Sequence, residues 1–163
     1  MAFIGTIPPV PSGVVPAKTT RFNNGIWLFD KPMGTGVGFI YVIRDIILHR
    51  FYLGKKSYKV SRGKLKGSES NWRNYKSSSN LLKDMMKERP KEEFEFIVIE
   101  EYKTKGTLSY SETWSLCLVE APTTTEWYNT RIEEVAWSVK EPISDKHKDR
   151  LKRVLAWEDF KET

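Results

Sequence analysis

Two short apolar segments lie close together in the chain, at residues 39–43 and 51–55. Both are rich in aromatic and branched side chains, which favour extended strands. Charged pairs at 44–45 and 49–50 flank a short apolar connection between the two segments. Strands joined by so short a connection pair in antiparallel fashion. The sequence therefore predicts a β-hairpin at the centre of the fold.

Two further strands are predicted around this hairpin. Residues 94–102 alternate apolar and polar side chains, and residues 26–29 form a shorter apolar run that ends at Asp30-Lys31-Pro32. A glycine cluster at 34–38 lacks the Lys-Ser/Thr pair of a phosphate-binding loop, and no helix is predicted after it. We therefore expect this cluster to form a turn.

Three helices are predicted from the spacing of apolar residues. The first covers residues 81–86, and serines at 77–79 can cap its N-terminus. The second covers 107–119, where Ser109 and Glu112 have the spacing of a capping box. The third begins at residue 144, and its apolar stripe consists of Leu151, Val154, Leu155 and Phe160.

The predicted order of elements is β-β-β-α-β-α-loop-α. This order is typical of a small α+β domain, in which helices flank an antiparallel sheet of hairpin strands. We expect a Pro-rich N-terminal arm at residues 1–24, an ordered domain at 25–138 and a charged C-terminal helix at 139–163. No apolar run approaches the ~20 residues that a transmembrane helix needs.

The charge balance and the cysteine count narrow the classes of function. A net charge of +6 and a pI of about 9.3 favour a polyanionic partner, either nucleic acid or an anionic membrane surface. One cysteine and two histidines exclude a disulfide framework, a cysteine-based metal site and a histidine-rich zinc site. We expect a reducing intracellular compartment.

Positive charge is concentrated in residues 55–76. Eight lysines and arginines stand there against a single acid, Glu69, with three aromatic residues among them. A mobile, solvated loop is one interpretation of this run, since Gly63 and Gly67 interrupt it. The interleaved aromatic residues favour the other interpretation, a surface that binds nucleic acid. These aromatic residues are Tyr58, Trp72 and Tyr75.

An ordered set of motifs resembles the GIY-YIG nuclease family. The tripeptides Phe39-Ile40-Tyr41 and Tyr52-Leu53-Gly54 stand in the two hairpin strands, at about the interval that separates the two signature tripeptides of that family. The sequence Trp72-Arg73-Asn74-Tyr75 is similar to a segment of phage-borne members. Tyr110-Ser111-Glu112 and Tyr128-Asn129 stand where the family has its metal-binding glutamate and a Tyr-Asn pair. The resemblance covers about residues 38–129.

The resemblance implies a DNA endonuclease that hydrolyses phosphodiester bonds with one Mg²⁺ or Mn²⁺ ion, bound by Glu112. Tyr41 would take a proton from water, Tyr52 would orient water or phosphate, and Asn129 would hold the phosphate or a neighbouring side chain. Nearby positive charge and the metal are expected to lower the pKa of Tyr41. The family usually carries an arginine on a helix after the second tripeptide, and here a basic loop stands in that place. The cation that stabilises the phosphate is therefore left open among Lys55, Lys56 and Arg62.

The expected partner is double-stranded DNA, with no membrane association. A homodimer would help to cut both strands. We expect a phage-type homing or free-standing endonuclease, or a restriction enzyme, in the cytoplasm of the cell or of a phage host. The alternative is a nuclease-derived protein that binds DNA or an assembly without cutting, in which the tyrosines pack and Glu112 only caps its helix. The predicted DNA-binding residues are Lys59, Lys64, Lys66, Trp72, Arg73, Tyr75, Lys76 and Ser78.

Overall fold

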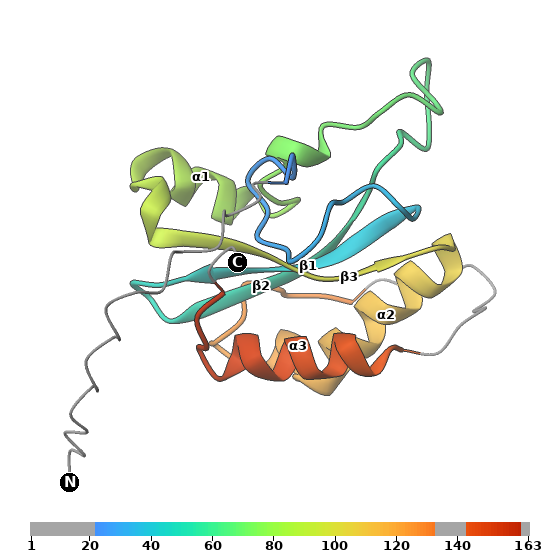
Figure 1. Ribbon diagram of the computed structural model, residues 1–163. Coiled ribbons are helices and arrows are strands. Elements are labelled where there is room, and N and C mark those ends of the chain that lie inside the picture. The colour runs from blue at the N-terminus through green and yellow to red at the C-terminus, as the bar shows by residue number, and fades with distance from the viewer. Residues whose placement is uncertain (1–21, 133–142, 161–163) are drawn as a thin grey trace, which may run out of the picture.

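The computed structural model describes residues 22–132 and 143–160, and in these residues a three-stranded antiparallel sheet lies between helices (Figure 1). Helix α1 covers one face of the sheet, and α2 and α3 cover the other. This arrangement confirms the predicted α+β class. The strands are β1 (Gly38–Asp45), β2 (Arg50–Ser57) and β3 (Phe94–Tyr102), and the helices are α1 (Asn80–Glu88), α2 (Lys105–Leu118) and α3 (Asp145–Leu155).

Strand β1 lies at the centre of the sheet, in the order β2-β1-β3. The predicted hairpin is confirmed, with Gly38 opposite Ser57 and Asp45 opposite Arg50. The pairing of β1 with β3 shifts register between Ile40 and Tyr41. A β-bulge of this kind re-aims the side chains beside it. All of β1 is buried, because it has a strand on each side and helices above and below.

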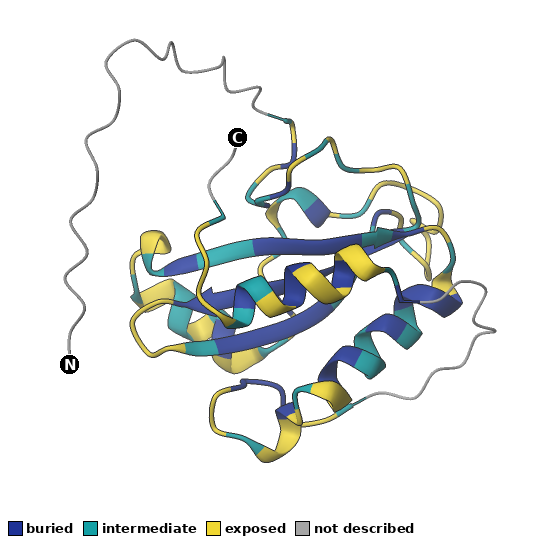
Figure 2. Ribbon diagram, turned by 60° about the horizontal axis from the view of Figure 1, so that its bottom comes forward, coloured by how far each residue is buried: buried dark blue, intermediate teal, exposed yellow. Residues whose placement is uncertain are grey.

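Alternation along the strands divides the core into two parts. Ile40 and Val42 point toward α2 and α3, whereas Phe39, Tyr41 and Ile43 point toward α1. The second part is rich in aromatic side chains, so much of the aromatic content of the chain serves core packing. Figure 2 shows the buried strands and the buried inner sides of the helices against them. The aromatic residues of this part are Trp27, Phe29, Phe39, Tyr41, Tyr52, Tyr58, Trp72, Phe94 and Tyr128.

The helix caps confirm one expectation and correct another. Ser79 caps α1, since its side chain accepts a hydrogen bond from the amide of Leu82, and Ser144 caps α3 in the same way. Helix α2 begins at Lys105, two residues earlier than predicted, because Thr104 is its N-cap. The predicted capping box is therefore wrong. Glu112 lies in the middle of α2, where no orphan amide is available to it.

The predicted strand at residues 26–29 is also wrong. Only Leu28 pairs with β3, through the bonds Leu28 N to Phe96 O (2.8 Å) and Val98 N to Leu28 O (3.0 Å). A turn with positive φ at Gly25 precedes this bridge, and Pro32, which has no amide hydrogen, follows it. The chain thus touches the sheet at one residue and then leaves it.

The glycine cluster at 34–38 forms bends, as expected, before it enters β1. The amides of Gly34 and Thr35 donate to the carboxylate of Glu101, at 2.8 and 3.1 Å. These amides are therefore engaged within the protein. Most of the predicted arm, residues 1–21, lies outside the described residues, as do 133–142 and 161–163. Among the described residues, no helix is long and apolar enough to cross a membrane.

Candidate active site

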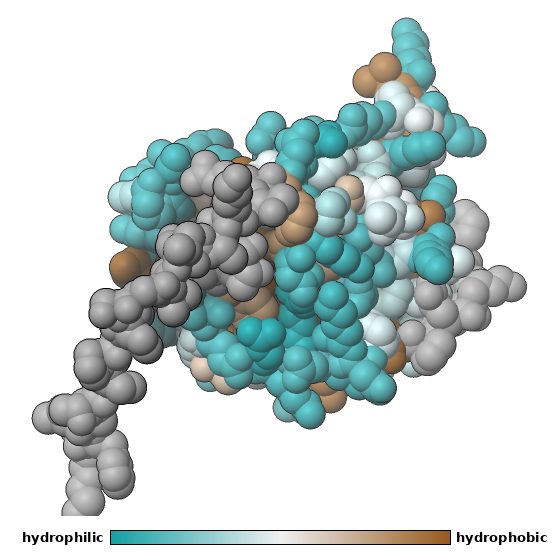
Figure 3. Space-filling view, in the orientation of Figure 1, coloured by the Kyte–Doolittle hydropathy of each residue, from teal (hydrophilic) through white to brown (hydrophobic). Residues whose placement is uncertain are grey.

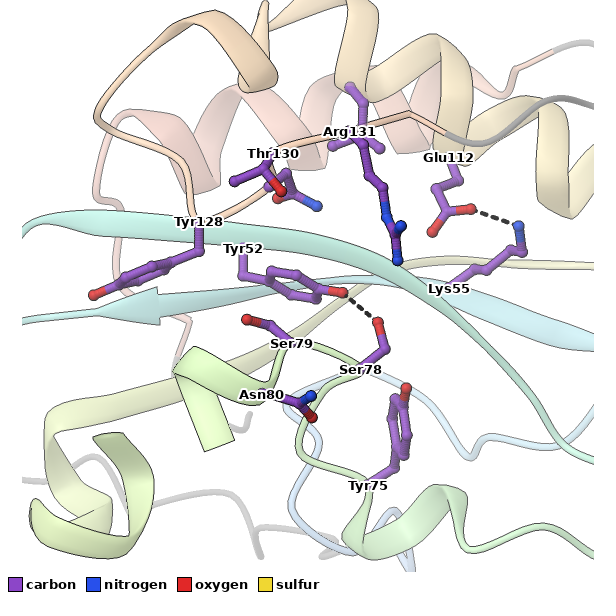
Figure 4. A pocket seen from close by; sticks show the side chains of 12 residues that line it. Tyr52, Lys55, Tyr75, Ser78, Ser79, Asn80, Glu112, Tyr128, Thr130 and Arg131 are labelled. Atoms are coloured by element: carbon purple, nitrogen blue, oxygen red, sulfur yellow. Dashed lines mark hydrogen bonds and ion pairs between the residues drawn. The ribbon is translucent and has the colours of Figure 1, made fainter. Parts of the chain in front are cut away.

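A cavity of about 530 Å³ opens beside β2, one of the two edge strands of the sheet (Figure 4). Four parts of the chain line it: β2, residues 75–80 before and at the start of α1, the middle of α2, and residues 128–131. The predicted catalytic residues that line it include a phenol, an ammonium and a carboxylate, on Tyr52, Lys55 and Glu112. Its walls therefore combine a hydroxyl and a cation from β2 with a carboxylate from α2.

Lys55 and Glu112 form an ion pair at one side of the cavity. The Lys55 Nζ lies 2.6 Å from Glu112 Oε2, and both side chains are mostly buried. Alternation along β2 explains the pair, because Lys55 lies on the same face of the sheet as Leu53, toward α2. Among the described residues no three His, Cys, Asp or Glu side chains gather in a cluster that could hold a metal. Among the residues that line the cavity, Glu112 is the one that carries a carboxylate.

A wall of hydroxyl groups forms the opposite side. The Tyr52 hydroxyl lies 2.7 Å from Ser78 Oγ, and Tyr75 lines the cavity beside them. Tyr41 lies behind this wall, 1% exposed, and does not line the cavity. A Cβ at position 54 would lie 2.5 Å from the Tyr41 hydroxyl oxygen, so only glycine fits there. The second tripeptide thus needs its glycine to make room for the tyrosine of the first.

Burial determines the protonation of Tyr41. Desolvation raises its pKa well above the usual value, and the neighbouring Tyr52, Tyr75 and Glu112 raise it further. The lowering of this pKa that was expected from neighbouring lysine and arginine charge is therefore not found in the described structure. The neighbours that act on Tyr41 are hydroxyls and a carboxylate, and the ammonium of Lys55 is directed to Glu112.

Asn129 fastens a separate segment to the free edge of β2. Its Oδ1 accepts a hydrogen bond from the amide of Leu53 (2.9 Å), and its Nδ2 donates to the carbonyl of Leu53 (2.8 Å). Two residues earlier, Trp127 bridges to Phe51 in parallel fashion. Both ends of the Asn129 side chain are thus used by the backbone of β2.

Arg131 is the cavity residue that the sequence analysis missed. It follows Asn129 by two positions, so in extended backbone the two side chains leave on the same side. Figure 4 shows its guanidinium between the Tyr52 hydroxyl and the Glu112 carboxylate. The spacing from the Tyr-Asn pair was the available signal, but the expected arginine was sought near the second tripeptide instead.

The three predicted cations occupy different places. Of these three, Lys55 lines the cavity. Lys56 points to the other face of β2, where its Nζ lies 2.9 Å from Asn71 Oδ1 and 4.0 Å from the centre of the Tyr75 ring. Burial lowers the pKa of Lys56. Arg62 does not line the cavity and is exposed on the loop after β2.

The predicted DNA-binding residues also lie in different environments. Trp72 is 2% exposed in the aromatic core, so its ring is unavailable for stacking on a base, which corrects that expectation. Arg73 lies over the Trp72 ring and pairs with Glu69. Tyr75 and Ser78 line the cavity. The remaining predicted contacts are exposed lysines: Lys59, Lys64, Lys66 and Lys76.

Comparison with known proteins identifies the family. Residues 22–132 match the family model described as "Putative endonuclease segE, GIY-YIG domain". Comparison with curated proteins and with solved structures gave no match. The family match covers more than half of the chain and includes every described element except α3, together with all residues that line the cavity. The chain belongs to the GIY-YIG nuclease family.

Proposed function

We propose that the protein is an endonuclease that hydrolyses phosphodiester bonds of double-stranded DNA in the cavity beside β2. One observation carries the proposal: a tyrosine hydroxyl, two cations and a single carboxylate meet in one cavity of a chain that belongs to a nuclease family. Phosphodiester hydrolysis needs an activated water, positive charge on the phosphate and help for the leaving oxygen. The side chains for these tasks are Tyr52, Lys55, Arg131 and Glu112.

The donor set fits one divalent cation. Mg²⁺ is commonly bound through one or two carboxylates together with substrate phosphate and water, and Glu112 is the carboxylate that lines the cavity. Glu112 would hold Mg²⁺ or Mn²⁺, and its contact with Lys55 would have to be shared or exchanged. A bound divalent cation would supply positive charge to the phosphate and lower the pKa of water.

The chain's own cations act on the substrate directly in this proposal. Arg131 is directed into the cavity, and a guanidinium can bind two phosphate oxygens at once. We assign it the stabilisation of the charged phosphate. Lys55 orients Glu112, and its ammonium can turn toward a phosphate oxygen. Arg62 and Lys56 do not line the cavity, so we assign them to DNA binding outside the reacting centre.

The two signature tyrosines take different tasks. Tyr52 lines the cavity, and its hydroxyl shares a hydrogen bond with Ser78. As the phenolate, Tyr52 would accept the hydrogen bond of the Ser78 hydroxyl and take a proton from the attacking water, which converts the phenolate to the phenol. Tyr41 is buried, and its hydrogen bond with Tyr75 raises its pKa. We therefore assign Tyr41 a positioning role: it holds Tyr75 at the cavity wall.

The proposal extends to the setting of the enzyme. Cutting both strands of a duplex requires two reacting centres, which a homodimer would provide. Reduced Cys117 and the basic charge fit an intracellular enzyme of the phage type, homing or free-standing, or a restriction enzyme. The cytoplasm is the corresponding location.

A nicking assay on supercoiled plasmid, with Mg²⁺ and with a chelator, tests the function. The parental protein should nick only with the metal. Glu112→Gln keeps the shape of the side chain and removes its charge, so cleavage should fall by at least about 10²-fold while DNA binding persists. Glu92→Gln, on an exposed acid outside the cavity, is the matched control. If the parental protein binds DNA but fails to cut it whichever divalent metal is added, the protein is instead a nuclease-derived binding protein.

A further inference from the structure

Residues 59–69 form a finger that projects from the body of the protein (Figure 1). Lys59 pairs with Glu69 in antiparallel fashion. The amide of Val60 donates to Ser68 O and its carbonyl accepts from the amide of Gly67, each at 2.9 Å. At the tip, Gly63 and Gly67 adopt positive φ of 78° and 87°. The predicted loop thus has the form of a short two-stranded ribbon closed by a turn, which we call the basic finger.

The tip of the basic finger combines cations with one exposed apolar side chain. Arg62, Lys64 and Lys66 are exposed, and the finger contains one acid, Glu69, which pairs with Arg73 at its base. Leu65 stands between the lysines and is 69% exposed, the most exposed large hydrophobic side chain among the described residues. Figure 3 shows a hydrophobic spot near the end of this projection, among hydrophilic residues. An apolar side chain held in water at the end of a cationic projection indicates a binding surface.

We propose that the basic finger enters the major groove of the substrate duplex, where its cations bind phosphates and Leu65 contacts thymine methyl groups. The inference rests on the proposed function and adds to it the element that reads the DNA. The major groove, about 12 Å wide, admits a two-stranded ribbon in undeformed B-DNA, whereas the minor groove is only about 6 Å wide. The thymine 5-methyl group is the apolar feature of the major groove, and it suits a leucine.

The base of the basic finger is fastened to the wall of the candidate active site. Lys56 bonds to Asn71 just beyond the finger and lies over the ring of Tyr75, which lines the cavity. Ser70 N donates to Tyr58 O at 2.7 Å and closes the base. Six residues of extended chain from Tyr58 reach at most about 20 Å. The tip can therefore read base pairs up to about six steps from the cut, since the rise is about 3.4 Å per base pair.

The first experiment measures the charge contribution in a chelating buffer, so that no DNA is cut. Affinity for a short duplex is titrated against salt for the parental protein, for Lys64→Ala/Lys66→Ala, and for Lys148→Ala/Lys152→Ala on the exposed side of α3 as a matched control. Each phosphate contact contributes about 0.9 to the slope of log affinity against log salt. The finger variant should lose about one to two units of slope, and the α3 variant should match the parent.

The second experiment isolates Leu65. Binding to an A·T-rich duplex is compared with binding to the same duplex in which uracil replaces thymine, which removes only the 5-methyl groups. The parental protein should bind the thymine duplex more tightly, by about fourfold for each methyl contacted. Leu65→Ala should bind both duplexes equally. Leu81→Ala, a change at a 60% exposed leucine on α1, should retain the parental preference.

The outcomes separate this inference from the function beneath it. Suppose that the parental protein nicks plasmid with Mg²⁺, but Leu65→Ala keeps the thymine preference or the α3 variant, rather than the finger variant, loses salt slope. The finger then does not read the groove, and the nuclease function stands. If the parental protein neither binds nor nicks duplex DNA, both proposals are overturned. Leu65, Lys64 and Lys66 are exposed, so these variants test contact with DNA rather than folding.

Discussion

Tyr41 and Tyr52 carry the same functional group in environments that differ in access to the cavity. Tyr52 lines the cavity and bonds to Ser78, whereas Tyr41 is enclosed behind Gly54 and Tyr75. A group that exchanges a proton with substrate water must reach that water. The pair therefore offers a comparison in which one oxygen atom is removed at a time.

Tyr52→Phe should lower the single-turnover cleavage rate by about 10²-fold or more, which is typical of losing a general base. Tyr41→Phe should lower it by roughly tenfold, because it removes only a hydrogen bond that positions Tyr75. Both rings keep their packing, so thermal denaturation should shift little in either variant. A larger loss in Tyr41→Phe than in Tyr52→Phe would contradict the assignment and make Tyr41 the hydroxyl that meets water.

At the level of elements, the free edge of β2 creates the cavity. An edge strand presents unpaired backbone groups, and residues 127–129 cover those groups of β2 from Phe51 to Leu53. The same segment then delivers Arg131 to the cavity. A buried ionic cluster supports its start: the Tyr128 hydroxyl donates to Asp45, which also binds Arg89. Burial acts to raise the pKa of Asp45, but bonds from Arg89, Leu48 and Tyr128 hold it at about 2.

Asn129→Ser should lower the free energy of unfolding by about 1–3 kcal/mol, because both backbone groups of Leu53 lose their partner. Cleavage should fall with it, since Arg131 is no longer held. Urea denaturation and single-turnover cleavage measure the two effects, with Thr125→Ala, an exposed change in the same segment and outside the cavity, as the control. Unchanged stability with lost cleavage would show instead that Asn129 contacts the phosphate, as the family resemblance implies.

For the whole molecule, α3 completes the core and joins three elements at one buried histidine. His147 of α3 is fully buried, with Nδ1 3.0 Å from the Tyr102 hydroxyl of β3 and Nε2 2.8 Å from Ser115 Oγ of α2. Leu151 and Val154, on the predicted apolar stripe, pack in the same core as β1 and β2. The C-terminal helix is thus part of the packed body of the protein.

Acid should destabilise the whole molecule through His147. Burial lowers its pKa from 6.5 to about 4, so between these values the unfolded chain binds a proton that the folded protein excludes. The contribution of neutral His147 to the free energy of unfolding is complete above about pH 6.5. It is lost as the pH falls toward 4, by about 3 kcal/mol in total. Urea denaturation across this range measures it. His147→Gln should flatten the dependence, whereas His49→Gln, an exposed change, should retain the parental slope. An equal slope in His147→Gln would assign the acid sensitivity to other groups.

Local patterns in the sequence account for the elements. Aromatic and branched residues with a short connection predicted the β1–β2 hairpin, and alternation predicted β3. Helical spacing predicted α1 and α3, and the ordered set of motifs indicated the family. These features depend on neighbours within a few residues, so their periods are visible in the chain alone. The same reasoning failed at residues 26–29 and at the start of α2, where a single bridge and Thr104 decide the structure.

The composition of the cavity was decided by tertiary structure. Lys55 and Lys56 are adjacent and equivalent in sequence, yet the pleat of β2 sends Lys55 to Glu112 and Lys56 to Tyr75. Arg131 enters the site because Asn129 binds Leu53, 76 positions away. Trp72 was predicted to contact DNA, but the aromatic core encloses it. Contacts between distant segments leave no periodic trace in the sequence, and burial and charge pairing at the site depend on those contacts.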